Sequence, residues 1–133
     1  FGSRIDSTGN DRIASGKFAA RMVGNNPVPA LIQMNFDLPD GASKVTVSYS
    51  SYGARADQSS QFILEYSTNE GRSWTKTGNE ILAAKKTHKT PSFNLDIKGM
   101  VRFRISKLGL GKTSDSISNG RLCIDDIAIY KNQ

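Results

Sequence analysis

Apolar and polar residues alternate strictly in three segments of the chain, and this period of two constrains the fold more than any other feature. The segments are Lys44–Ser50, Gln61–Tyr66 and Met100–Ser106. In the last of them, Val101, Phe103 and Ile105 fall on one face. Arg102 and Arg104 fall on the other face. Because successive side chains of a strand point to opposite faces, the pattern predicts half-buried antiparallel strands that share a core.

Five further segments fit a strand less closely, and residues typical of turns separate the segments. These weaker candidates are Lys17–Val23, Ala30–Leu38, Glu80–Ala83, Ser92–Ile97 and Arg121–Tyr130. Turn residues lie at Asn25–Pro29, Pro39–Gly41, Asn69–Gly71, Lys98–Gly99 and Asn119–Gly120. Gly and Asn accept positive φ, and Pro presets φ. With no helical stripe in the chain, about eight or nine strands at this spacing predict an all-β antiparallel sandwich or barrel.

The size and composition of the chain favour one domain and exclude several classes of site. The 133 residues contain no internal repeat or linker, so we expect a single domain over 1–133. Residues 1–16 are expected to form a loosely ordered or truncated N-terminal edge. No apolar run approaches the roughly 20 residues of a spanning helix, so membrane insertion is not expected. One His and one Cys exclude a His/Cys zinc site and an intrachain disulfide.

The segment Ser67–Trp74 reads S-x-N-x-G-x-S-W and follows a predicted strand. It resembles the Asp-box hairpin of many β proteins, with Asn69 where Asp is usual. The side chain of Asn69 is expected to bond backbone amides, and Gly71 to take a positive φ. Two interpretations stay open for Trp74, which packs in the core or forms an exposed platform for a ligand.

Two adjacent carboxylates, Asp125 and Asp126, interrupt the apolar strand near the C-terminus. In a regular strand they point to opposite faces, which places at least one near the core or an inter-strand seam. Burying a carboxylate is costly unless it is paired, hydrogen-bonded or bound to a metal. Two interpretations stay open. The pair binds Ca²⁺, which prefers oxygen ligands, or it lies in a bulge and caps loop amides.

The order of several motifs resembles a known class of module. The motifs are Asn35–Asp37, Lys44–Ser48, Tyr52–Gly53, Asp57–Ser60, Leu64–Thr68, Gly71–Trp74, Val101–Ile105 and Leu122–Ile127. In this order they are similar to jelly-roll accessory modules of secreted bacterial proteins, of the galactose-binding and MAM type. The resemblance covers Gly16 to Tyr130. Such modules are attached to endonuclease/exonuclease domains or to glycan-degrading enzymes.

The resemblance implies a jelly roll, a non-catalytic role and often one structural Ca²⁺. The calcium aspartate of these modules lies in the last strand and matches Asp125, with Asp126 beside it. The other ligands usually come from the N-terminal strand, where this chain offers Asp6. The resemblance also implies a linked catalytic domain and an extracellular, cell-surface or periplasmic location.

Motifs of several enzyme classes are missing from the sequence. Gly111–Thr113 ends like a phosphate-binding P-loop, but Ser106 stands where the first Gly of that motif belongs. No G-x-S-x-G elbow occurs. Cys123 has no neighbour in the sequence that would activate its thiol, and His88 is expected in a solvated turn or edge strand. We therefore expect a chain that is not an enzyme.

The basic surplus of the chain is concentrated in one stretch. Eighteen Lys and Arg residues against twelve Asp and Glu give a net charge of +6. Between Ala83 and Lys112, eight basic residues stand against Asp96 alone, a balance of +7. Arg102 and Arg104 share one strand face within this stretch, and a basic face could hold phosphate or sulfate. Alternatively, it is a solvated face with Lys guarding edge strands.

Three hypotheses for function follow, none of them catalytic. The first is a carbohydrate-binding module, with Tyr52, Asp57 and Gln58 in one loop and Arg102 and Arg104 on a sheet face as candidate ligand-binding residues. The second is a domain that serves a linked nuclease and holds nucleic-acid backbone through phosphate contacts. The third is a structural spacer or protein-interaction domain. The sequence does not predict the oligomeric state.

Overall fold

The computed structural model describes residues 3–6, 19–22, 30–51, 59–84, 88–108 and 120–131. These residues form ten strands: β1 (Ser3–Asp6), β2 (Ala19–Met22), β3 (Ala30–Gln33), β4 (Ala42–Ser51), β5 (Ser60–Ser67), β6 (Thr75–Ala83), β7 (His88–Lys89), β8 (Ser92–Ile97), β9 (Arg102–Leu108) and β10 (Leu122–Tyr130). In the described part of the chain there is no helix, and hence none long and apolar enough to cross a membrane.

The strands lie where the alternating pattern predicts them. The three strictly alternating segments form the long strands β4, β5 and β9. The weaker candidates correspond to β2, β3, β6, β8 and β10, and β8 has the bounds that were expected. β3 is shorter than expected and ends at Gln33. Leu38, at the far end of that candidate, forms an isolated bridge with Val101.

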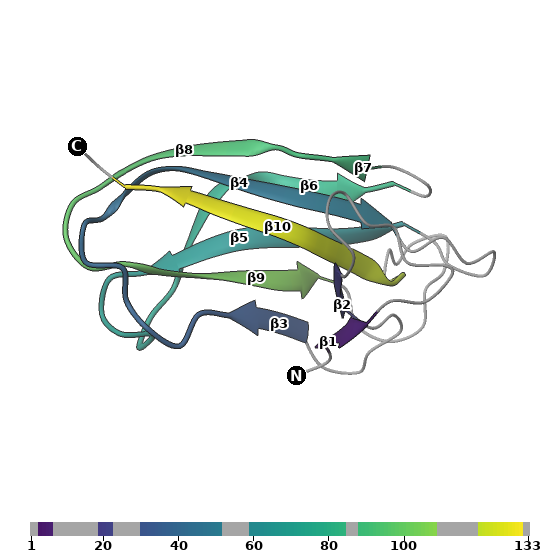
Figure 1. The fold of residues 1–133 in the computed structure, drawn as a ribbon, viewed down its shortest axis with the longest axis horizontal. Helices are drawn as coiled ribbons and strands as arrows, with labels where there is room; N and C mark the ends of the chain where they lie inside the picture. The colour runs from purple at the N-terminus through teal and green to yellow at the C-terminus, as the bar shows by residue number, and fades with distance from the viewer. Residues whose placement is uncertain are drawn as a thin grey trace.

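The strands make two antiparallel sheets that pack as a sandwich (Figure 1). Sheet A has the order β1-β2-β10-β4-β7, and β8 also pairs with β4. Sheet B has the order β3-β9-β5-β6. The all-β antiparallel sandwich is therefore confirmed.

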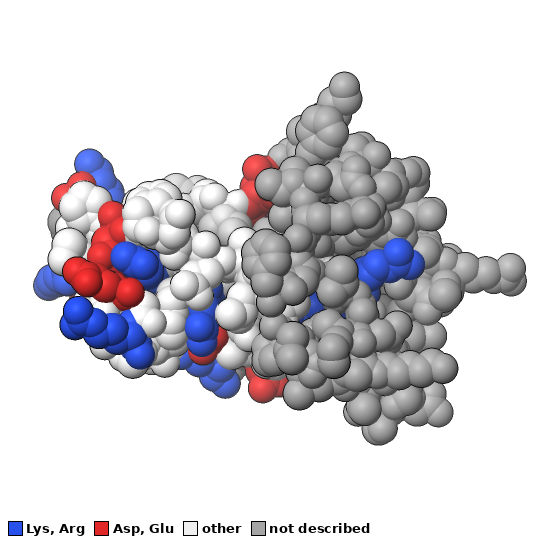
Figure 2. All heavy atoms as spheres, turned by 90° about the horizontal axis from the view of Figure 1, so that it is seen from below, with Lys and Arg blue, Asp and Glu red and all other residues white. Residues whose placement is uncertain are grey.

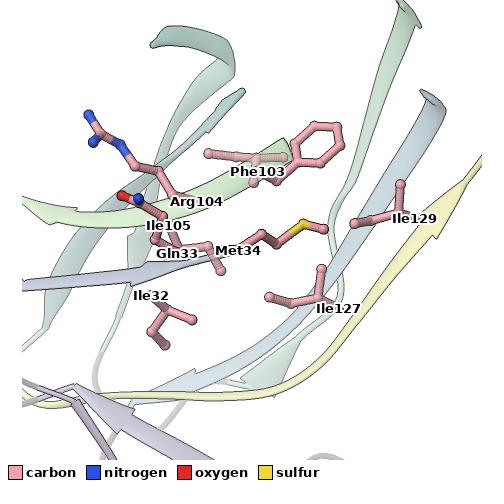
Figure 3. Close-up of a pocket in the computed structure, with 9 residues that line it drawn as sticks. Ile32, Gln33, Met34, Phe103, Arg104, Ile105, Ile127 and Ile129 are labelled. Carbon is pink, nitrogen blue, oxygen red and sulfur yellow. The ribbon is translucent and has the colours of Figure 1, made fainter. Parts of the chain in front are cut away.

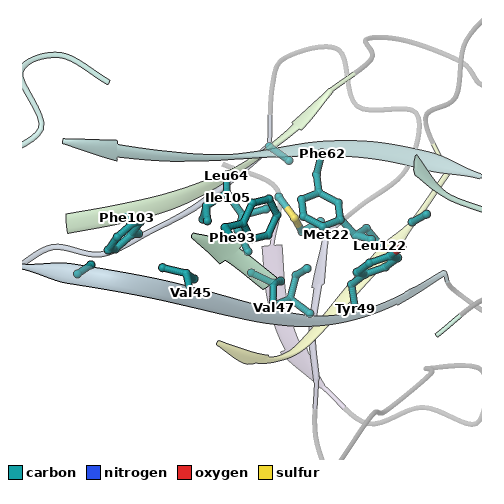
Figure 4. Close-up of a cluster of buried hydrophobic side chains, with 14 of the residues drawn as sticks. Met22, Val45, Val47, Tyr49, Phe62, Leu64, Phe93, Phe103, Ile105 and Leu122 are labelled. Atoms are coloured by element: carbon teal, nitrogen blue, oxygen red, sulfur yellow. The ribbon is translucent and has the colours of Figure 1, made fainter. Parts of the chain in front are cut away.

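The core lies between the two sheets and is built by the inner faces of the alternating strands (Figure 4). Val45, Val47 and Tyr49 of β4 are all buried, as the period of two requires. The ring of Tyr49 meets that of Phe62 from the opposite sheet edge-on, with 5.2 Å between the centroids. Each fully buried apolar side chain contributes about 1.5–3 kcal/mol, so these inner faces dominate the stability of the sandwich.

A β-bulge in β10 resolves the problem of the paired carboxylates. The register against β4 shifts between Ile124 and Asp126, which leaves Asp125 as an extra residue. Ile124 pairs with Tyr49 before the bulge, and Ile127 pairs with Val47 after it. Asp125 is half-buried and Asp126 is exposed. Asp125 therefore lies at the seam between β10 and β4, which is one of the two places expected for a carboxylate, and the bulge restores apolar residues to the inner face. The bulge itself is confirmed, while capping of loop amides by the two carboxylates stays a prediction.

Lys107 is buried between the sheets, although the sequence placed it in a basic stretch. It follows Phe103 and Ile105 on the inward face of β9 and is only 1% exposed. Burial disfavours the charged ammonium and lowers the pKa of Lys107 to about 8. This lysine therefore adds nothing to an external basic face.

One side of the sandwich is closed by a close contact between the sheets. β6 carries a bulge opposite β5, and Gly78 lies in it with φ +71°. A Cβ atom on Gly78 would come within 2.7 Å of Cδ2 of Phe93, a buried ring of β8. β8 and β6 accordingly run along the same edge of the molecule (Figure 1).

Replacing Gly78 by Ala is expected to lower the free energy of unfolding by about 3 kcal/mol, because it adds left-handed strain and a clash with Phe93. Gly99→Ala is the matched control, since Gly99 has φ +91° but nothing within 4 Å of its added Cβ. This control variant should lower the free energy of unfolding only by the backbone strain, about 1 kcal/mol. Urea unfolding of both variants measures the difference, and equal losses would contradict the proposed role of Phe93.

Stability should rise with pH between about 8 and 10.5 because of Lys107. In this window the unfolded chain keeps the lysine proton while the folded protein has released it, so raising the pH favours the folded state, by up to about 3 kcal/mol. Burial raises the pKa of Tyr49, which opposes this trend. Urea unfolding across this pH range, with Lys107→Met alongside, isolates the lysine. Parallel pH profiles for the two proteins would contradict the prediction.

Candidate ligand-binding face

The outer face of sheet B gathers polar side chains from all four of its strands. The register aligns Gln33 of β3 with Arg104 of β9, and Arg104 with Glu65 of β5. Glu65 pairs in turn with Lys76 of β6. Residues that pair directly point to the same face, so these four form one row across the sheet. We call this row, together with Asp37, Arg102 and Trp74, the sheet B face.

Both arginines of the sheet B face are ion-paired. Nε of Arg102 donates to Oδ1 of Asp37 at 2.7 Å, and Nε of Arg104 donates to Oε1 of Glu65 at 2.8 Å. The four side chains are only 13–21% exposed. The hydrogen bond to Asp37 is the main cause that raises the pKa of Arg102. Partial shielding from water strengthens such charge-assisted bonds.

These pairs change the interpretation of the basic stretch. The sequence places Arg102 and Arg104 among basic residues, but their carboxylate partners lie 65 and 39 positions away in the chain. On the face drawn in Figure 2, the basic and acidic side chains of the described residues are interspersed. Lys85, Lys86 and Lys112 of the stretch lie outside the described residues. The described part of the stretch therefore does not form a uniformly positive face.

The hairpin between β5 and β6 has the bonds expected of an Asp-box turn. Oδ1 of Asn69 accepts the amide N–H of Ser73 at 3.0 Å. The hydroxyl of Ser67 accepts the amide N–H of Gly71 at 2.9 Å, and Gly71 has φ +85°. Glu70 also has a positive φ, of 64°. The predicted turn is therefore confirmed, with Asn69 in the role of the usual Asp.

Trp74 matches neither of the two interpretations given to it. Its ring is half-buried on the sheet B face rather than in the core. Nε1 donates to the carbonyl oxygen of Gly71 at 3.1 Å, which folds the ring back on the hairpin. The guanidinium of Arg104 lies 4.3 Å from the ring centroid, a cation–π contact. The guanidinium of Arg104 is thus held by two contacts, one with the ring of Trp74 and one with the carboxylate of Glu65.

The structure brings together only part of the predicted binding set. Arg102 and Arg104 lie side by side on β9, whereas Tyr52, Asp57 and Gln58 lie outside the described residues. Sequence reasoning missed the other members of the sheet B face, which are Gln33, Asp37, Glu65 and Lys76. Glu65 lies in a strictly alternating segment, whereas Lys76 lies outside the predicted strands. Only the pairing of β5 with β6 and β9 shows that both share a row with Arg104.

The predicted calcium ligands are not assembled within the described residues. Asp125 is half-buried at the bulge of β10, and Asp126 is exposed. Asp6 pairs with Ala19 of β2, and β2 pairs with β10, so β1, which carries Asp6, lies two strands away from β10. The side chain of Asp6 is not among those described. No three His, Cys, Asp or Glu side chains in the described ranges come together as a metal site. These residues alone therefore do not complete a calcium site, which takes about six to eight oxygens.

Comparison with known proteins shows the fold. No family model and no curated protein matches the chain. TmCBM61, solved in complex with β-1,4-galactotriose, is 14% identical with a TM-score of 0.61, covering 98% of this chain and 83% of that one. The CBM22-1 xylan-binding domain of Paenibacillus barcinonensis Xyn10C is 7% identical with a TM-score of 0.60, and the match covers 99% of this chain and 84% of that one. The carbohydrate-binding module CBM36, solved with calcium and xylotriose, is 13% identical with a TM-score of 0.50, and the match covers 96% of this chain and 92% of that one. The chain therefore has the jelly-roll sandwich fold of these modules.

Proposed function

We propose that the chain is a non-catalytic carbohydrate-binding module and that its ligand lies on the sheet B face. Its fold is that of structures described as binding galactotriose, xylan and xylotriose. The face itself supplies the chemistry, since Gln33, Arg104, Glu65 and Lys76 form a row of donors and acceptors across four strands. The resemblance to secreted accessory modules supports an extracellular, cell-surface or periplasmic parent protein with a linked glycan-degrading domain.

The two ion pairs are the observation that carries this proposal. Asp37 neutralises the charge of Arg102, and Glu65 neutralises that of Arg104. The two ion pairs therefore attract a polyanion only weakly. Each carboxylate bonds Nε, which is one of the five N–H donors of a guanidinium. The remaining donors and carboxylate oxygens suit the hydroxyls of a neutral sugar, and hydrogen bonds to charged groups contribute about 1.5–3 kcal/mol.

The ligand-binding mechanism is recognition by a pre-formed, shallow polar face. Arg104 is fixed between Glu65 and the ring of Trp74, so little side-chain entropy is lost when a sugar binds. Tyr52, Asp57 and Gln58 are proposed as the loop side of the site. Their support is chemical, because a phenol ring can stack on a sugar face while a carboxylate and an amide bond its hydroxyls.

A glycan array of neutral and sulfated oligosaccharides is expected to identify a neutral ligand, and calorimetric titration then measures its affinity. Gln33→Ala should weaken binding about fivefold and Lys76→Ala about tenfold, since each removes one hydrogen-bonding group. Both side chains are exposed, so the melting temperature should not change.

Asn94→Ala is the matched control, because Asn94 is an exposed amide on β8 of the opposite sheet. It should leave the affinity unchanged. An array without signal would remove the proposed function. Binding to oligonucleotides that falls steeply with salt, without binding to glycans, would instead favour the nuclease-associated hypothesis.

The calcium ion that the resemblance implies belongs to the same proposal, with Asp125 as the ligand from β10 and Asp6 and Asp126 as further candidates. Calcium at about one hundred times its Kd should raise the melting temperature by roughly 5–10 °C over EDTA. Asp125→Asn should remove this difference, and Asp40→Asn, at an exposed turn, should not. Identical melting temperatures of the unaltered protein in calcium and in EDTA would rule out the ion.

A further inference from the structure

An apolar groove of about 120 Å³ lies between the two sheets, next to the sheet B face. Its walls come from both sheets, because Ile32 and Met34 of the β3 segment lie across from Ile127 and Ile129 of β10 (Figure 3). Ile127 is 41% exposed, so the groove reaches the protein surface at this residue. A small apolar group can therefore enter it from solvent.

The groove adjoins the sheet B face at two residues. Gln33 and Arg104 line the groove, and they are also paired neighbours in the row of donors and acceptors across sheet B. Figure 3 shows the polar ends of both side chains on the side away from Ile127 and Ile129. Because Gln33 ends the row, a ligand bonded there has its next substituent beside the apolar walls of the groove.

The size of the groove selects a small group. A closed cavity of about 150 Å³ lined by Leu, Ile and Phe side chains holds one benzene ring. This groove is slightly smaller, at about 120 Å³, and reaches the surface at Ile127. It therefore has room for one six-membered ring and not for a long lipid chain.

Two of the lining side chains favour an aromatic ring. Met34 extends across the groove toward Ile129 (Figure 3), and a thioether sulfur makes favourable contacts with aromatic rings. Phe103 lines the groove as well, and aromatic pairs gain energy beyond their buried area. A sugar ring does not suit this lining, because its hydroxyls would lie against apolar side chains without hydrogen-bond partners.

We propose that the groove binds an aromatic ring attached to one sugar of the glycan, while Gln33 and Arg104 bond that sugar. This inference rests on the proposed function, because the sheet B face must hold the sugar for the ring to reach the groove. The ligand class is then an aryl-substituted glycan, and the groove selects the substituent.

NMR titration with matched phenyl and methyl β-glycosides of galactose, glucose and xylose tests the inference. The phenyl glycoside should bind about tenfold more tightly than the methyl glycoside of the same sugar, because the ring leaves water. Ile127→Gln should remove most of this preference and leave the affinity for the methyl glycoside unchanged. Leu82→Gln is the matched control, since Leu82 is 52% exposed on β6, at the other end of sheet B. This control variant should keep the preference.

The outcomes separate this inference from the proposed function. Oligosaccharide binding on the array together with equal affinities for phenyl and methyl glycosides would overturn the aromatic ligand alone. A preference that survives Ile127→Gln would overturn it too. An array without signal would instead remove the proposed function.

Methyl NMR of the unaltered protein locates the ring without any variant. The ring current of a bound phenyl group shifts nearby methyl resonances, so phenyl glycosides should shift those of Met34, Ile127 and Ile129. Methyl glycosides should leave them in place, and the methyl groups of Leu82 are the control signals. Shifts confined to methyl groups outside the groove would contradict the inference. Shifts that follow protein concentration without any glycoside would assign the groove to a second copy of the chain and overturn it as well.

Discussion

The contact between the inner faces of β4 and β5, centred on Tyr49 and Phe62, is the interaction on which the other features depend. It fixes which side of each strand faces inward, because a slip of one residue would turn every side chain to the other face. The outer positions of β5 and β9 are fixed by the same choice. Glu65 and Arg104 can meet on the sheet B face only because Leu64 and Ile105 are committed to the core.

Much of the fold follows from the sequence because the apolar alternation is local information. The strands β4, β5 and β9 are visible in it, and so is the turn around Asn69. The bulge of β10 is less visible, because it depends on avoiding the burial of Asp125 and Asp126, which competes with regular pairing. Sequence spacing alone places at least one of these carboxylates near the core or an inter-strand seam, and only the pairing of β10 with β4 shows that Asp125 is the extra residue of a bulge at that seam.

The candidate site could be predicted only in part, because its electrostatics are non-local. Arg102 and Arg104 are recognisable as neighbours on one strand face, but Asp37 and Glu65 come from distant segments. The pairing turns an expected positive face into a largely neutral one. Lys107 is a second residue whose surroundings depend on the fold rather than on its basic neighbours in the sequence. It occupies the inward face of β9 and is buried there despite the cost of burying an ammonium.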